Sequence, residues 1–69
     1  MHTARIPSAV ELMRFPAGDR VLRLRWLVRW HSERAAALEA VGSSAAVTHH
    51  RNSLRKVMAV AAQCEVQIS

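Results

Sequence analysis

The segment of residues 20–30, RVLRLRWLVRW, constrains the fold most, because it fits two incompatible backbone periodicities. In a strand, alternate side chains share one face. Those side chains would be Leu22, Leu24, Trp26, Val28 and Trp30. In a helix, apolar residues recur at three- and four-residue spacing. That stripe consists of Leu24, Leu27, Val28, His31, Ala35 and Leu38. Because it continues past the segment and into an alanine run at residues 35–37, we predict a helix.

A second apolar stripe runs along the same predicted helix. Leu22, Trp26 and Trp30 follow one another at four-residue spacing and lie well round the helix from the first stripe. We expect the first stripe to pack on the following helix. The second stripe then needs the N-terminal helix, a second subunit or another protein to cover it.

Local signals mark where the helices begin and end. Ser8 and Glu11 have the spacing of a capping box, in which each residue satisfies a backbone amide of the other. Asp19 is suited to cap the start of the next helix. Gly42 is suited to the left-handed position that ends a helix, and a serine after it to the start of the last helix.

These signals predict an all-α fold: a small three-helix, helix-turn-helix-like domain, or a helical hairpin with a short N-terminal helix. The predicted helices are residues 8–15, 19–41 and 44–63, within one domain spanning residues 1–69. Residues 1–7 form an N-terminal arm, and residues 65–69 form a frayed tail or a short edge strand. The positions expected to be most buried are Leu24, Leu27, Val28, Leu38, Leu54, Val57, Met58 and Ala61.

Size and charge indicate that the chain has a partner. A single cysteine, Cys64, excludes an intramolecular disulfide, and a chain of 69 residues has room for only a modest core. We therefore expect a homodimer or a complex with another protein. The ten Lys and Arg residues exceed the five Asp and Glu residues, and the resulting charge of +5 favours an anionic partner.

Several classes of protein are not expected. No apolar run is long enough to span a membrane, and no secretory signal is recognisable, so we expect a cytoplasmic protein without a transmembrane segment. Interleaved arginine and tryptophan occur in membrane-surface peptides, but the alanine-rich continuation lacks large apolar anchors. Neither a glycine-rich phosphate loop nor a nucleophile with an obvious base is present. We expect no enzyme, no cofactor and no metal site, since the adjacent His49 and His50 diverge on a helix.

The last predicted helix has a polar, basic side that is suited to nucleic acid. Its candidate contact residues are Thr48, His49, Arg51, Asn52, Arg55 and Lys56. Arginine and asparagine make paired hydrogen bonds to base edges in the major groove of DNA, while Arg55 and Lys56 would position the phosphate backbone.

The chain also resembles the helix-turn-helix of the LuxR/GerE class of bacterial regulators. The resembling residues are residues 20–24 in a first helix, Ser32 opening the next, Ala37 as the small residue packed at the turn, and the run from Thr48 to Lys56 at the end of the recognition helix. The resemblance implies a DNA-binding transcription regulator that reads its target with residues 44–57.

The alternative interpretation is a non-enzymatic helical module that binds another protein, as an inhibitor, an adaptor or a small assembly subunit. Its candidate contacts are Leu22, Arg25, Trp26, Arg29 and Trp30. Tryptophan and arginine are the residue types most enriched at binding hot spots. The location of Trp26 and Trp30 separates the two hypotheses: burial in the core favours DNA binding, and exposure favours protein binding.

Overall fold

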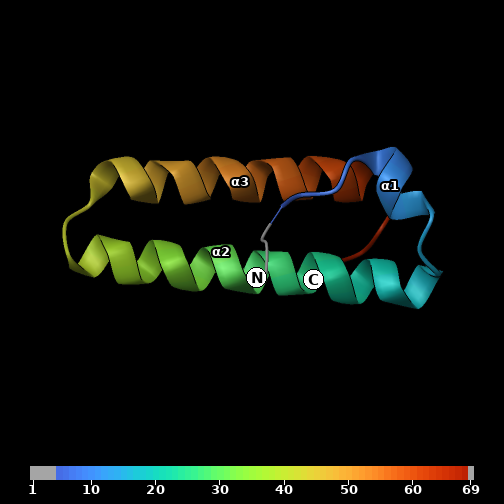
Figure 1. The fold of residues 1–69 in the computed structure, drawn as a ribbon, viewed down its shortest axis with the longest axis horizontal. Helices are drawn as coiled ribbons and strands as arrows, with labels where there is room; N and C mark the ends of the chain where they lie inside the picture. Colours follow the sequence, from blue (N-terminus) through green and yellow to red (C-terminus); the bar gives the residue numbers. More distant parts are fainter. Residues whose placement is uncertain (1–4, 69) are drawn as a thin grey trace.

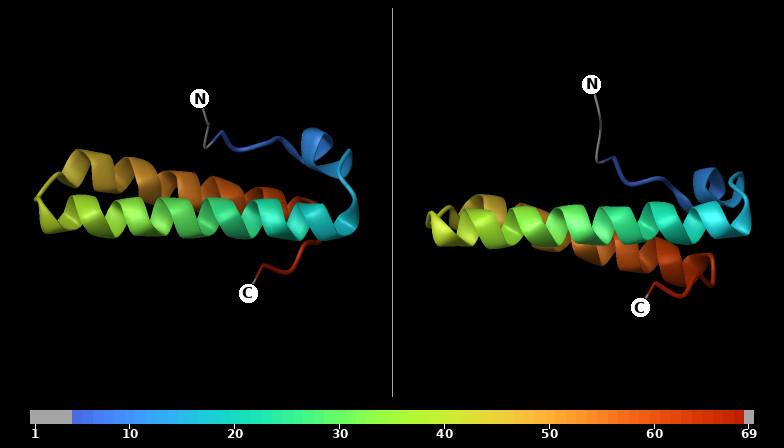
Figure 2. Two further views of the ribbon diagram at one scale, coloured as in Figure 1. Left: turned by 60° about the horizontal axis from the view of Figure 1, so that its bottom comes forward. Right: turned by 90° about the horizontal axis from the view of Figure 1, so that it is seen from below.

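The chain folds as a hairpin of two long helices with a short helix packed across its open end (Figure 1). The computed structural model describes residues 5–68. Its helices are α1 (Ala9–Met13), α2 (Ala17–Ala40) and α3 (Ser44–Gln63). Helices α2 and α3 run antiparallel and lie side by side in every view (Figures 1 and 2). The predicted all-α class is confirmed, and residues 20–30 are helical.

The predicted capping box at the start of α1 is confirmed. The Ser8 hydroxyl accepts a hydrogen bond from the Glu11 amide, and the Glu11 carboxylate accepts one from the Ser8 amide, both at 3.2 Å. The predicted cap of α2 was wrong, because the helix begins two residues before Asp19, directly after Pro16. Asp19 lies instead in the first turn, where its charge is favourable beside the exposed helix amides.

The two long helices end in the same hydrogen-bonding arrangement, a Schellman motif. After α2, Ser43 N donates to Leu38 O at 3.0 Å, and Gly42 has the left-handed φ of 79° that the motif needs. After α3, Val66 N donates to Ala61 O at 2.8 Å, and Glu65 occupies the left-handed position with a φ of 54°. The glycine stop was predicted from the sequence, whereas the second stop has no glycine to mark it.

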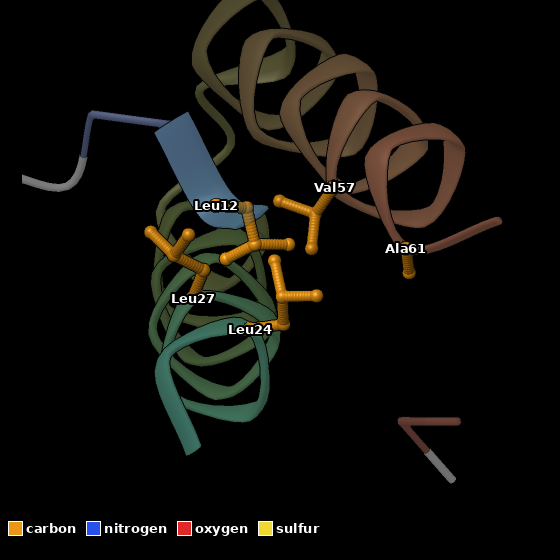
Figure 3. Packing of buried hydrophobic residues seen from close by; sticks show 5 residues of the cluster. All are labelled: Leu12, Leu24, Leu27, Val57 and Ala61. Atoms are coloured by element: carbon orange, nitrogen blue, oxygen red, sulfur yellow. The ribbon is translucent and has the colours of Figure 1, made fainter. Parts of the chain in front are cut away.

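The core lies where all three helices meet (Figure 3). Its buried members are Leu12, Leu24, Leu27, Val57 and Ala61. Leu12 was not predicted: it reaches from α1 toward side chains of both long helices and is fully buried.

The predicted core residues divide into three groups. Leu24, Leu27, Val57 and Ala61 are buried as expected, and Val28, Leu38 and Leu54 are half-buried. Met58 was predicted wrongly and is 54% exposed, because it lies one residue, or about 100° of helix rotation, from the fully buried Val57. The core-facing stripe of α3 instead includes the buried Val47, His50 and Ser53.

The segment after α3 packs back on the hairpin. Val66 and Ile68 contact the core cluster, and Arg25 Nε of α2 donates a hydrogen bond to Ile68 O at 3.0 Å. Through residue 68 this segment contains no strand, so the edge-strand alternative for the tail does not hold there. Ser69 and the first four residues of the predicted arm lie outside the described part of the chain.

Candidate functional site

The most distinctive surface is the side of α2 opposite its buried stripe, with Trp30 at the edge where it meets α3. We call it the tryptophan face and define it by Leu22, Arg25, Trp26, Arg29 and Trp30. Leu22 is 65% exposed and Trp26 is 45% exposed, although both are large apolar side chains. The opposite side of the same helix buries Leu24, Leu27, His31 and Ala35. One helix thus carries two apolar stripes, as predicted: the first faces the core, and the second leaves Leu22 and Trp26 exposed while Trp30 is half-buried.

Ring stacking and arginines organise the tryptophan face. The rings of Trp26 and Trp30 stack, with centroids 6.3 Å apart and an interplanar angle of 20°. The guanidinium of Arg34 lies 5.8 Å from the centroid of the Trp30 ring. Arg29 pairs with Glu33, one helical turn away, at 3.4 Å. The face therefore combines an aromatic platform with exposed positive charge.

Trp30 connects this face to the interior. Its ring makes edge contacts with the rings of His31 and His50, at centroid distances of 4.9 and 5.4 Å. Trp30 is only half-buried, while both histidines are buried. The two tryptophans thus differ: Trp26 belongs mainly to the surface, and Trp30 bridges the surface and the hairpin interior.

His31 and His50 form a buried pair that joins α2 to α3. Their Nδ1 atoms are 2.8 Å apart, so one ring must donate a proton and the other accept it. Burial lowers the pKa of His50, and the charges of His49 and Arg34 lower it further. The packing of His31 against the last helix was predicted, because it belongs to the first apolar stripe of α2. His50 was missed, although it belongs to a regular three- and four-residue spacing with Val47, Leu54, Val57 and Ala61. Within residues 5–68, no three His, Cys, Asp or Glu side chains lie close enough to hold a metal ion.

A cleft of about 360 Å³ adjoins Trp26, where the N-terminal segment and α1 meet α2. We call it the arginine cleft. Its lining includes Arg5, Glu11, Arg14, Phe15, Arg23 and Trp26. A second hollow, of about 430 Å³, shares Phe15, Arg23 and Trp26 with the cleft and extends to Leu22 and Asp19. The tryptophan face is therefore bordered by two concave surfaces, the arginine cleft and the second hollow.

The only carboxylate among the cleft residues is already engaged. Glu11 forms an ion pair with Arg5 through both of its oxygens. The hydrogen bonds from Arg5 and from the Ser8 amide lower the pKa of Glu11 to about 2. Among residues 5–68, Arg14 and Arg23 have no carboxylate within ion-pairing distance, and Arg23 lies over the Phe15 ring at 4.6 Å.

The candidate nucleic-acid contacts all lie on the exposed side of α3. These residues are Thr48, His49, Arg51, Asn52, Arg55 and Lys56. The helix contains no acidic residue, but Arg51 reaches across the hairpin to Glu39 at 3.0 Å. The helix that would precede it in a helix-turn-helix lies antiparallel beside it, whereas the two helices of that motif usually cross at about 90–120°.

In the part of the chain that the structure describes, no helix is long and apolar enough to cross a membrane. No family model, no curated protein and no solved structure matches the chain.

Proposed function

We propose that this chain is a non-enzymatic helical module that binds another protein through its tryptophan face. The observation that supports this most is the exposure of Leu22 and Trp26 on the side of α2 opposite the core. An exposed apolar patch on a small protein marks an interaction site, and a tryptophan flanked by arginines is the typical composition of a binding hot spot. Shielding of the patch by a partner would also supplement a small core.

A capture experiment with the purified, tagged chain and an extract of its source cells tests this function. We expect one protein to be retained in stoichiometric amount by the wild type and to be lost with Trp26→Ala. The matched control is Arg55→Gln with Lys56→Gln, which removes charge from α3 and leaves the tryptophan face intact. Recovery of nucleic acid in place of a protein, or equal capture by the Trp26→Ala chain, contradicts the proposal.

Binding of nucleic acid by α3 is the second candidate. It is supported by the exposure of all six candidate side chains on a helix that has no acidic residue. The segment from Thr48 to Lys56 is about 12 Å long at the helical rise, close to the width of a DNA major groove. Under this candidate the chain is a cytoplasmic transcription regulator, and a homodimer would present two such helices to two half-sites.

The salt dependence of duplex binding tests the second candidate. Each phosphate contact contributes about one unit to the slope of log affinity against log salt. Removing Lys56 should therefore lower the slope by about one unit on every sequence, while Arg51→Gln should weaken discrimination at one base pair. A duplex that does not bind even at low salt eliminates this candidate.

A further inference from the structure

We infer that the arginine cleft binds an acidic side chain of the partner, and that the partner presents it on an amphipathic segment lying along the tryptophan face. This inference rests on the proposed function and names the chemistry of the partner. Arg14 and Arg23 supply the charge, and Phe15, Leu22 and Trp26 supply the apolar contacts.

The cleft favours a negatively charged ligand because the carboxylate in its lining, Glu11, is already paired with Arg5. Three arginines and one glutamate are among its lining residues, and the glutamate is held by Arg5. Glu11 is ionised throughout the neutral range, and its ion pair with Arg5 largely neutralises both charges. Arg14 and Arg23 then remain for a ligand, and guanidinium groups bind carboxylates through strong, paired hydrogen bonds.

The surroundings of the two arginines select an apolar side chain next to the acidic one. Arg23, Phe15 and Trp26 line both the cleft and the neighbouring hollow, so a ligand that contacts Arg23 also meets both aromatic rings. Leu22 adds an exposed apolar contact one helical turn before Trp26. A segment with acidic and apolar side chains in register satisfies both surfaces. Asp19, in the second hollow, disfavours a ligand with acidic groups along its whole length.

A second copy of this chain is poorly suited to supply such a segment. Its five acidic residues are scattered, and the closest two, Glu33 and Glu39, are six positions apart. Three of the five, Glu11, Glu33 and Glu39, already pair with arginines of the same chain. Among residues 5–68, Asp19 and Glu65 are outside these pairs, and Asp19 lines the second hollow of the same face, so a different protein is the better source of the complementary charge.

Synthetic peptides test the inference without knowledge of the partner. The probe is a short, fluorescently labelled amphipathic helix with leucines on one side and glutamates beside them, and the comparison peptide has glutamine at every glutamate. Binding is followed by fluorescence anisotropy at neutral pH and low salt. We expect the acidic peptide to bind at least about tenfold more tightly than its glutamine counterpart, as charge-assisted hydrogen bonds are stronger than neutral ones.

The variant Arg14→Gln with Arg23→Gln should remove this preference, while Arg55→Gln with Lys56→Gln, which loses the same charge on α3, should keep it. Circular dichroism checks that both variants retain the wild-type helix content. The inference is overturned if the folded wild type does not bind the acidic peptide, if both peptides bind equally, or if the two variants lose affinity alike. It is also overturned if a random DNA duplex displaces the peptide through Arg14 and Arg23.

Failure of the inference and failure of the proposed function give different results. If both peptides bind equally and Trp26→Ala weakens both, the tryptophan face binds proteins without selecting acidic ones. If the capture experiment shows no dependence on Trp26, the proposed function itself fails, whatever the peptides do.

Discussion

At the scale of single residues, we expect the buried contact between His31 and His50 to make the hairpin sensitive to acid. The 2.8 Å separation of their Nδ1 atoms allows one proton between the rings, and a second proton would set two donors against each other. Around the pair lie the ring of Trp30 and the positive or titratable groups of Arg34 and His49. None of these groups favours a charged His50.

We therefore predict that stability falls as the pH decreases below about 6.5, the ordinary histidine pKa. Because burial lowers the pKa of His50, the unfolded chain binds more protons than the folded chain between the lowered and the ordinary value. Stability from this source is complete above the ordinary pKa and is lost on the acid side. One such proton corresponds to a slope of up to about 1.4 kcal/mol per pH unit.

Urea unfolding from pH 7.5 to pH 5 measures that slope. His50→Gln should reduce it, and the exposed neighbour variant His49→Gln should leave most of it in place. An unchanged slope in His50→Gln would show that other groups are responsible for the acid sensitivity.

A second prediction at this scale concerns Glu65, which occupies a left-handed position that glycine adopts more readily. Glu65→Gly should raise the free energy of unfolding by up to about 1 kcal/mol, since a residue with a Cβ is disfavoured there. Gly42→Ala, at the equivalent position after α2, should lower it by a similar amount. Thermal unfolding of the two variants checks the opposite signs, and a loss of stability in Glu65→Gly would contradict this interpretation.

At the scale of helices, α1 depends on one side chain. It has five residues, too few to be stable alone, and Leu12 is its only buried residue. The capping box and the ion pair of Arg5 with Glu11 shape the segment, but the burial of Leu12 against α2 and α3 attaches it to the hairpin. The position of α1 matters for the proposed function, because α1 contributes Glu11 to the lining of the arginine cleft.

Leu12→Ala should therefore destabilise the chain by about 2–5 kcal/mol, the range for a fully buried leucine. Met13→Ala, at an exposed neighbouring position, should change the stability by less than about 0.5 kcal/mol. Denaturant unfolding of both variants measures the difference. A cost for Leu12→Ala no greater than that for Met13→Ala would show that α1 is not anchored by this residue.

The helices could be predicted from the sequence because their signals are local. The Ser8–Glu11 spacing, Gly42 and the stripe from Leu24 to Ala35 each lie within one element, and each was confirmed. Leu12 and the arginine cleft depend on how separate elements pack together, whereas the burial of His50 was missed although its spacing within α3 indicated it. Arg14 and Phe15 come from the segment before α2, and Arg23 and Trp26 from α2 itself, so no local pattern brings them together.

At the scale of the whole molecule, residues 5–68 form three helices around a core with four fully buried large side chains. A domain of this size has a free energy of unfolding of about 3–10 kcal/mol. Because this free energy is small, replacing an apolar residue that stabilises the free chain should have a large and easily measured effect. The proposed function requires Leu22 and Trp26 to contribute little to it, because their role is in binding.

The most direct test of this account compares the two apolar stripes of α2 in the isolated chain. The outer variant is Leu22→Ala with Trp26→Ala, and the inner variant is Leu24→Ala with Leu27→Ala. By urea unfolding with circular dichroism, we predict that the outer variant keeps its helix content and loses clearly less stability than the inner variant, because Leu22 is 65% and Trp26 45% exposed, whereas Leu24 and Leu27 are buried. The inner variant should be unfolded, since each buried leucine contributes about 2–5 kcal/mol. Unfolding of the outer variant would place the tryptophan face in the core and contradict its role as a binding surface.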